Sequence, residues 1–428
     1  MYVILIHIIR FNMNREIALR VLVSFYKEKS YINIVLNKEL ENTNLSREDK
    51  NFITRVVYGT VQYQLYLEYL LNPFITGKRV KTFEKTLLLM SLYQHIYMDS
   101  IPDYAIVNEA VKIAKKQKGI KTANFINAVL NKAFKEKRSL EGLTEEERLS
   151  IETSHPLWLV KMLKKQYGLE ITKKICYSNN EVPHQSARVN TLLTSVDQIL
   201  ENPLFERAIR SKVGVYYKGG NIANTKEYKE GLLTVQDESS QLIASLLDPK
   251  ETDKVLDMCS APGSKTTHLA IHMNNKGHID AYDLYEHKIK LIEDNLKRMK
   301  LMNVSVHVGD STLLREQLDQ ESYDCILLDA PCSGLGDLRR KPEIRYHDSH
   351  IMDDIIPLQQ VLLENAYYLL KKGGRIVYST CTINKKENEK QIEKFVSLHN
   401  DMIKKYEETI LPFEYHSDGF YMCLLEKE

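Results

Sequence analysis

The chain has little glycine where nucleotide-binding motifs require it. In the turn APGSKT (261–266), Gly263 is the only glycine, so the G-x-G-x-x-G fingerprint of dinucleotide-binding folds is missing. The phosphate-binding P-loop is excluded as well, because Ser264 stands directly before Lys265, where that motif needs glycine. The turn therefore argues against an ATPase and against a cofactor that carries a pyrophosphate.

The cysteines lack the spacing of a metal site. No C-x-x-C pair occurs among the six, so we expect no zinc or other metal. Unpaired thiols indicate a reducing compartment, and we predict a cytoplasmic protein. Cys325 is expected in the core, and the backbone of Cys259 is expected to matter more than its sulfur. The six positions are Cys176, Cys259, Cys325, Cys332, Cys381 and Cys423.

Long apolar runs are also missing. The opening MYVILIHII has about nine apolar residues, short of the roughly 20 that span a bilayer, and no small-residue cleavage site follows it. We therefore predict no membrane segment. Because the helix-like segment REIALRVL begins just after Met13, residues 1–12 are interpreted as a possible start extension. With 428 residues and 43% hydrophobic content, the chain is long enough for about three domains.

The net charge is small, at +2, but it is unevenly distributed. Residues 1–140 carry 22 Lys and Arg against 12 Asp and Glu, whereas the whole chain carries 59 and 57. A cationic run at Lys112, Lys115, Lys116, Lys118 and Lys121 would attract nucleic-acid phosphates. A solvated helix face is the competing interpretation of such a run.

The second half of the chain has the pattern of a parallel α/β sheet. Apolar runs of strand type alternate with helical segments, and acidic residues stand where strands end: Asp283, Asp310 and Asp329. Ligands bind at the carboxyl edge of such sheets, where an acid after the second strand binds ribose hydroxyls, and we assign Asp283 that role. A cofactor with a ribose and an adenine but no phosphate fits best, which indicates S-adenosylmethionine. The expected strands are 253–260, 278–284, 305–310, 323–330 and the run ending at Thr380.

Two cysteines are predicted at the same edge of the sheet. Cys332 lies in DAPCSGLG (329–336) and Cys381 in YSTCT (378–382), and each follows an expected strand. A thiol at such a place is a candidate nucleophile, metal ligand, redox partner or small buried hydrophobe. The surrounding residues favour a catalytic role.

These motifs resemble those of the RNA cytosine-5 methyltransferases. The order DMCSAPGSKT, GDS, DAPCSGLG and YSTCT matches that family, with VQDESSQL (235–242) before it and GFYMCLLEK (419–427) after it. Four segments within the first 140 residues resemble the NusB-like helical domain of the RsmB (Sun/Fmu) branch, whose members modify small-subunit ribosomal RNA. The four segments are REIALRVL, RVVYGTVQ, NEAVKIAK and FINAVLNK. Ser264 departs from the family, which often has a second glycine there.

The resemblance implies a multidomain fold and a site. We expect an all-α NusB-like domain (1–145), a linker helix with a small α+β module (146–230) and a Rossmann-like methyltransferase domain (231–428). The resemblance also assigns three roles. Cys381 attacks the base, Cys332 assists its release from the enzyme, and Asp329 binds ring nitrogen 3. The chemistry fits, because carbon 5 of cytosine accepts a methyl group only after a nucleophile adds to carbon 6. The implied cofactor-binding residues are Cys259, Ser260, Ala261, Pro262, Gly263, Ser264, Lys265, Asp283, Asp310 and Asp329.

Basic residues give two candidate RNA contacts. The first is the helical face with Lys112, Lys115 and Lys116. The second is the segment LRRKPEIRYH (338–347), which follows the DAPC motif and is interpreted as a surface loop that clamps phosphates. Its candidates are Arg339, Arg340, Lys341 and Arg345.

Alternatives remain open from the sequence alone. Pro-Cys is the attacking pair in DNA cytosine-5 methyltransferases, which would make Cys332 the nucleophile. A noncatalytic NusB-type factor for ribosomal RNA assembly, or a cytosine-5 methyltransferase of tRNA, is the competing function. The intact thiols and acids favour an enzyme, and the NusB-like segments favour ribosomal RNA. We expect a monomer that binds small-subunit ribosomal RNA.

Overall fold

The computed structural model of the chain contains two compact units. Unit 1 comprises Met1–Asn180 and Lys341–Tyr346, and unit 2 comprises Glu181–Arg340 and His347–Glu428. The structure describes residues 2–28, 31–41, 43–136 and 138–428, with side chains from Met13 onward in those ranges. The possible start extension at 1–12 therefore lies outside the described side chains. Within the described ranges, none of the helices has the length and apolar character needed to cross a bilayer.

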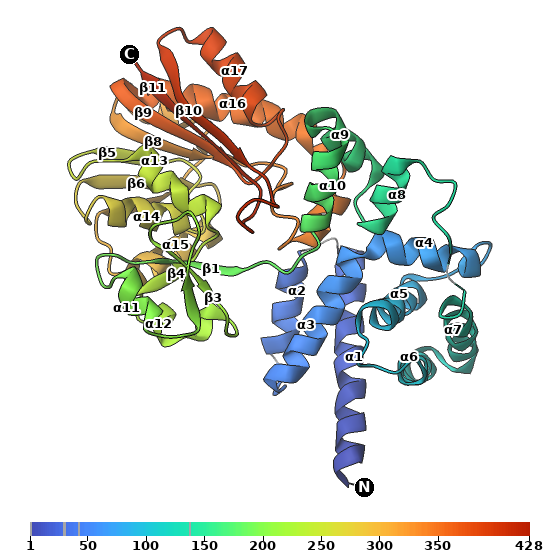
Figure 1. Cartoon of the computed structure of the whole chain (residues 1–428). Coiled ribbons are helices and arrows are strands. Elements are labelled where there is room, and N and C mark those ends of the chain that lie inside the picture. The colour runs from blue at the N-terminus through green and yellow to red at the C-terminus, as the bar shows by residue number, and fades with distance from the viewer. Residues whose placement is uncertain (1, 29–30, 42, 137) are drawn as a thin grey trace. The chain divides into compact units, whose positions relative to one another are not determined.

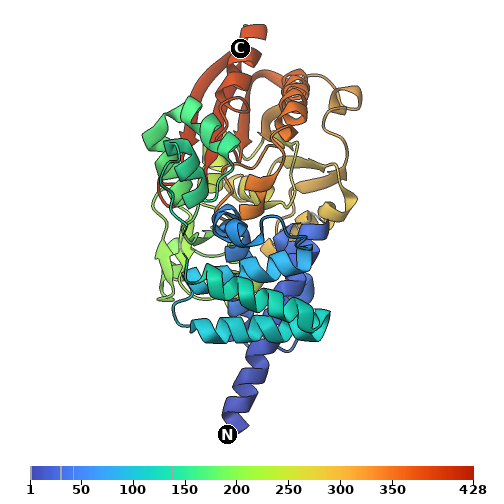
Figure 2. The same cartoon turned by 90° about the vertical axis from the view of Figure 1, so that its right-hand side faces the viewer.

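Unit 1 is a helical bundle, drawn mainly in blue to green in Figures 1 and 2. Its central helix α5 is buried without interruption from Thr86 to Gln94, as expected of a segment that is apolar on all sides. Leu22, Val57, Ala114 and Leu130 pack into the same core from four other helices. The all-α prediction is confirmed. The helices are α1 (Tyr2–Glu28), α2 (Ile32–Glu41), α3 (Arg47–Gln62), α4 (Gln64–Ile75), α5 (Thr82–Tyr97), α6 (Asp103–Lys118), α7 (Ile120–Ala133), α8 (Glu145–Glu152), α9 (Leu157–Tyr167), α10 (Leu169–Ser178) and the 3-10 helix η4 (Pro342–Tyr346).

Unit 2 begins with a small antiparallel sheet. Its strand order is β2-β3-β1-β4, and Val189, Phe205, Val215 and Leu233 form its own apolar cluster. These elements correspond to the predicted α+β module. They are β1 (Gln185–Val189), α11 (Val196–Leu200), β2 (Phe205–Arg207), β3 (Gly214–Tyr217), η1 (Ile222–Asn224), α12 (Lys226–Lys229) and β4 (Leu233–Val235).

A seven-stranded mixed sheet forms the rest of unit 2. Its order is β10-β11-β9-β8-β5-β6-β7, with β5 to β9 parallel and β11 antiparallel to both of its neighbours. The predicted Rossmann-like sheet is thus confirmed, with two antiparallel strands at one edge. The strands are β5 (Lys254–Asp257), β6 (His278–Asp283), β7 (Val304–Val308), β8 (Tyr323–Asp329), β9 (Leu370–Thr380), β10 (Met402–Ile410) and β11 (Phe420–Lys427).

Helices cover both faces of this sheet. Successive strand residues point to opposite faces, so Ile326 and Leu328 join one core cluster while Cys325 and Leu327 join the other. Cys325 is therefore a core residue, as predicted. The first face carries α16 (Ile351–Leu369) and α17 (Glu389–Leu398), the orange and red helices of Figure 1. The second carries α13 (Ile243–Leu247), α14 (Ser264–His272) and α15 (Glu286–Met299), and the short 3-10 helices η2 (Ser239–Leu242) and η3 (Leu314–Glu316) complete the unit.

Candidate active site

The carboxyl ends of the parallel strands converge on one cavity of unit 2. The cavity has a volume of about 400 Å³, and all three predicted acids and both predicted thiols line it. Its lining residues are Met258, Cys259, Ala261, Asp283, Leu284, Tyr285, Lys288, Gly309, Asp310, Ser311, Thr312, Asp329, Ala330, Pro331, Cys332, Leu358, Leu362 and Cys381. Parallel pairing explains the convergence, because Asp329 at the end of β8 lies in register with Ser379 near the end of β9.

The turn after β5 is fastened to β6. The Ala261 N–H donates to Asp283 Oδ2 at 3.2 Å, and the Ser260 N–H and hydroxyl both donate to the Tyr282 carbonyl at 2.9 Å. Gly263 then adopts a φ of +93°, a conformation that favours glycine, and α14 begins at Ser264. Ser260 and residues 262–265 are not among the residues that line the cavity.

The cavity is rich in carboxylates and poor in cations. Three aspartates, Asp283, Asp310 and Asp329, line it, and Lys288 is the one Lys or Arg among the described residues of its lining. Lys288 Nζ lies 3.8 Å from Asp283 Oδ1. A negative lining disfavours phosphate groups and suits a ligand with a positive charge and hydroxyl groups. The residues present therefore fit S-adenosylmethionine, whose sulfonium and amino group are cationic.

Asp329 is held from two sides. Lys265 Nζ donates to its Oδ2 and the Ser379 hydroxyl donates to its Oδ1, both at 2.7 Å. Burial lowers the pKa of Lys265, but the adjacent Asp329 carboxylate outweighs it and the pKa is raised. Lys265 is therefore a cation that orients Asp329. Behind it, burial raises the pKa of Asp257 to about 7, although the Thr266 hydroxyl donates to this carboxyl at 2.7 Å.

The two thiols are in direct contact. Cys332 Sγ and Cys381 Sγ are 3.2 Å apart, which places both at the same point of the cavity. The hydrogen bond with Cys381 and burial raise the pKa of Cys332 well above its usual range. Because two adjacent sulfurs cannot both carry a charge cheaply, the pair can supply one thiolate and one thiol.

A close backbone contact holds the Cys332 loop against Cys381. The Gly336 N–H donates to the Cys381 carbonyl at 2.9 Å, and the Gly419 N–H donates to the Gly336 carbonyl at 2.9 Å. A Cβ atom at Gly336 would lie 1.9 Å from the Gly419 carbonyl oxygen. Any side chain at position 336 would therefore push the loop away from the thiol pair.

The predicted clamp at 338–347 is wrong for two of its four residues. Arg345 is fully buried in unit 1, where it donates to carbonyls at the ends of three helices, those of Gln62, Thr153 and Asn179. Arg339 is also buried, and it donates to the Pro412 and His416 carbonyls. A buried guanidinium that already donates to protein carbonyls has no face left for a phosphate, so neither is an RNA contact.

The other two residues of that segment remain candidates. Arg340 pairs with Asp237 at 3.0 Å and with Asp418 at 2.6 Å, while Lys341 is exposed. In unit 1, Lys112, Lys115 and Lys116 are exposed on α6; Lys112 pairs with Glu109 and Lys116 with Glu16, each at 2.9 Å. Glu109 is buried, so only the Lys116–Glu16 pair is close to the exposed kind that is worth about 0–1 kcal/mol and that a phosphate can replace.

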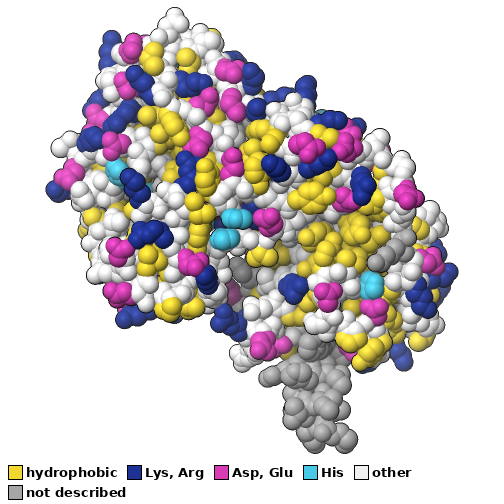
Figure 3. All heavy atoms as spheres, in the orientation of Figure 1, with side chains coloured by type: hydrophobic (Ala, Val, Ile, Leu, Met, Phe, Trp, Pro, Cys, Tyr) yellow, Lys and Arg dark blue, Asp and Glu magenta, His cyan; other side chains and the backbone are white. Residues whose placement is uncertain are grey.

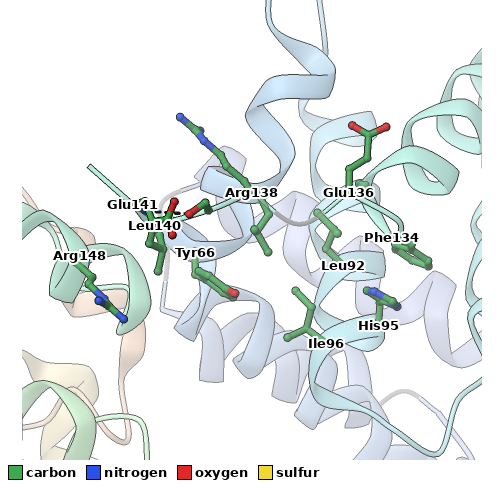
Figure 4. Close-up of a pocket in the computed structure, with 13 residues that line it drawn as sticks. Tyr66, Leu92, His95, Ile96, Phe134, Glu136, Arg138, Leu140, Glu141 and Arg148 are labelled. Atoms are coloured by element: carbon green, nitrogen blue, oxygen red, sulfur yellow. Dashed lines mark hydrogen bonds between the residues drawn. The ribbon is translucent and has the colours of Figure 1, made fainter. Parts of the chain in front are cut away.

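A larger cavity in unit 1 lacks the groups that the chemistry needs. It measures about 700 Å³, and Figure 4 shows His95 and Phe134 on one side and Arg138 and Arg148 on the other. The His95 and Phe134 rings are stacked at 4.0 Å. The described residues of its lining include neither cysteine nor aspartate. The smaller cavity of unit 2 is therefore the candidate active site.

We searched the described residues for metal-binding groups and the face shown in Figure 3 for charged patches. On the face shown in Figure 3, basic and acidic side chains are interspersed over unit 2. Among the described residues, no group of three or more His, Cys, Asp or Glu is arranged to hold a metal ion.

Three residues of the site were not predicted from the sequence: Ser379, Lys288 and the buried Glu387, which contacts the Cys332 loop. Ser379 stands in the quoted YSTCT motif, but no pattern indicated its bond to Asp329.

Three family models together match most of the chain. A family model described as 16S rRNA methyltransferase RsmB/F matches residues 244–426. The NusB family model matches 12–135, and a Methyltr_RsmF/B-like ferredoxin-like domain matches 155–213.

Whole-chain relatives agree with these matches. The probable ribosomal RNA small subunit methyltransferase B of Bacillus subtilis is 37% identical over 97% of this chain and 98% of its own length. The protein of the same description from Synechocystis sp. is 32% identical over 96% and 99%. The crystal structure of PH0851 superposes with a TM-score of 0.83 at 26% identity, covering 96% of this chain and 98% of that one.

Proposed function

Because this chain belongs to the RsmB/F family of 16S rRNA methyltransferases, we propose that it methylates carbon 5 of a cytosine in small-subunit ribosomal RNA through a covalent Cys381–cytosine bond. The observation that carries the proposal is the contact between Cys332 and Cys381, 3.2 Å apart in a cavity lined by aspartates. S-adenosylmethionine supplies an electrophilic methyl group when it is bound there. A site that only bound RNA would not need two thiols at that point.

The residues have separate tasks in the proposed reaction. The Cys381 thiolate forms a bond to carbon 6, and the electrons of the 5,6 double bond move to carbon 5, which then accepts the methyl group. Asp329, oriented by Lys265 and Ser379, binds ring nitrogen 3. In the last step the proton of carbon 5 passes to Cys332 in its thiolate form, the electrons of that bond restore the 5,6 double bond, and the carbon–sulfur bond breaks to regenerate the Cys381 thiolate.

Bisulfite sequencing of 16S ribosomal RNA tests the proposal. RNA from cells that contain this gene should keep one cytosine that resists conversion, and RNA from deleted cells should lose it. Restoring the wild-type gene should bring the resistant cytosine back, whereas a Cys381→Ala gene should not. Equal conversion at every cytosine in all strains would show that the chain does not methylate carbon 5 of this RNA.

Asp283→Ala is expected to weaken S-adenosylmethionine binding by about 1 to 3 kcal/mol, because ribose hydroxyls would lose their acceptor. The same carboxylate also accepts the Ala261 and Tyr285 N–H groups, so part of the loss comes from a looser turn. Calorimetric titration measures the change, with the exposed Asp294→Ala on α15 as the matched control. Equal affinities for the two variants would remove Asp283 from the cofactor site.

Replacing Lys112, Lys115 and Lys116 together with alanine is expected to flatten the salt dependence of RNA binding. Each phosphate contact contributes about 0.7 to the slope of log affinity against log salt concentration, so three lost contacts lower the slope by about 2. The control replaces Lys250, Lys276 and Lys300, which are exposed and precede β5, β6 and β7 at the other edge of the sheet. An equal slope for both triple variants would place the RNA anchor elsewhere.

A further inference from the structure

A buried carboxylate lies beneath the thiol pair without contacting the cavity. Glu387 follows β9 and precedes α17, and its side chain is fully buried in unit 2. It does not line the cavity that contains Cys332 and Cys381. Burying a carboxylate costs several kcal/mol unless hydrogen bonds compensate, so its partners indicate what it does.

Both oxygens of the Glu387 carboxylate accept hydrogen bonds from Ser333, the residue next to Cys332. The Ser333 N–H donates to Oε2 at 2.8 Å, and the Ser333 hydroxyl donates to Oε1 at 2.6 Å. The Asn384 amide donates to Oε1 at 2.9 Å from the segment that follows Cys381. Ser333 Oγ also lies 2.8 Å from Thr382 Oγ1, next to Cys381. One carboxylate thus connects the loop of each thiol.

The residue on the other side of Cys332 is held by the same network. The Gln359 amide of α16 donates to the Pro331 carbonyl at 2.9 Å and to Glu387 Oε2 at 3.4 Å. Gln391 of α17 donates to Gln359 Oε1 at 2.9 Å, which fixes the orientation of that amide. Both neighbours of Cys332 are therefore fixed, and the thiol between them has little freedom to move.

We propose that Glu387 is a positioning residue that aims the Cys332 thiol at the adduct formed by Cys381 and so sets the rate of RNA release. This inference rests on the proposed function. Glu387 itself touches neither the cavity nor the base, so it acts through the Cys332 loop. A thiol displaced by about 1 Å can lose on the order of 100-fold in rate.

The charge of Glu387 acts in the same direction as its geometry. The pKa of Cys332 is raised by the hydrogen bond with Cys381 first, by burial next, and also by the negative charge of Glu387. The Glu387 carboxylate therefore acts on Cys332 through its charge as well as through the loop that it holds.

Glu387→Gln tests the inference in the full-length enzyme. The glutamine has the same shape but replaces one acceptor and the charge with an amide that must face the Ser333 donors. We expect release of methylated RNA to slow by about 10- to 100-fold, with a covalent protein–RNA complex accumulating on a denaturing gel. S-adenosylmethionine affinity should stay as in the wild type. Glu389→Gln is the matched control, because its carboxylate accepts from Thr409 instead of the Cys332 loop.

A second variant, Ser333→Ala, and a second control, Cys332→Ala, make the test of Glu387 decisive. If Glu387→Gln does not fold, Ser333→Ala removes the hydroxyl contact alone and should also accumulate the complex, to a smaller extent. Release at the wild-type rate in the folded variant overturns the positioning role. Cys332→Ala is run beside them: if it accumulates no complex, the proposed roles of the thiols have failed, and if it alone accumulates complex, only the inference about Glu387 has failed.

Discussion

Cys381→Ala is expected to abolish methyl transfer to RNA while S-adenosylmethionine still binds. The thiol acts on the base alone, and without it carbon 5 of the cytosine stays too poor in electrons to accept a methyl group. The loss of an enzyme nucleophile costs on the order of 10⁴-fold or more in turnover. Transfer of a labelled methyl group to 16S RNA measures the first effect, and calorimetry measures the second.

The matched control for this variant is Cys423→Ala. Cys423 is a buried thiol on β11 and does not line the cavity, so its loss should leave turnover within a small factor of the wild type. Substantial turnover in Cys381→Ala would show that this thiol is not the nucleophile. Loss of cofactor binding in that variant would show instead that the substitution damages the cavity as a whole.

The main fold could be predicted because its strands are continuous apolar runs. Parallel strands are buried on both faces, so segments such as CILLDA (325–330) stand out from the polar helices around them. The order of these strands along the chain also predicts where the cavity lies, because residues that follow parallel strands meet at one edge of the sheet. Asp329 and Cys381 could be assigned to that edge from the sequence alone. The hydrogen bond from Lys265 to Asp329 and the contact between Cys332 and Cys381 could not.

The supporting residues could not be predicted, for a physical reason. Glu387 lies in KKENEK, a charged run that is typical of a solvated segment, and only the turn after β9 brings its carboxylate under Ser333. For Arg345 the prediction is wrong in the opposite direction, because a basic segment is typical of a surface loop whereas this side chain is buried. In the fold, the carbonyls at the ends of α3, α8 and α10 need donors, and the Arg345 guanidinium supplies them.

Cys332→Ala is expected to distinguish the roles of the two cysteine sulfurs. Attack by Cys381 and methylation of carbon 5 should still occur, because neither step uses the second thiol. Elimination should fail, because the group that assists proton removal and carbon–sulfur cleavage is gone. Removing a nucleophile blocks entry to a covalent intermediate, whereas removing a group needed for elimination lets the intermediate accumulate.

The opposite result is expected if Cys332, rather than Cys381, is the nucleophile. If Cys332 attacked the base, as the Pro-Cys pair does in DNA cytosine-5 methyltransferases, Cys381 would be the thiol needed for release. The 3.2 Å contact places both sulfurs within reach of one base and so does not by itself choose between them. The assignment of attack to Cys381 rests on the resemblance of the YSTCT motif to the RNA cytosine-5 methyltransferases.

Denaturing gel electrophoresis after incubation with 16S RNA and S-adenosylmethionine tests the central claim most directly. The account predicts a slowly migrating protein–RNA complex for Cys332→Ala, none for Cys381→Ala, and none for the double variant, since the second substitution removes the attacking sulfur. A complex with Cys381→Ala instead would exchange the two roles. No complex with either single variant would contradict a covalent mechanism altogether.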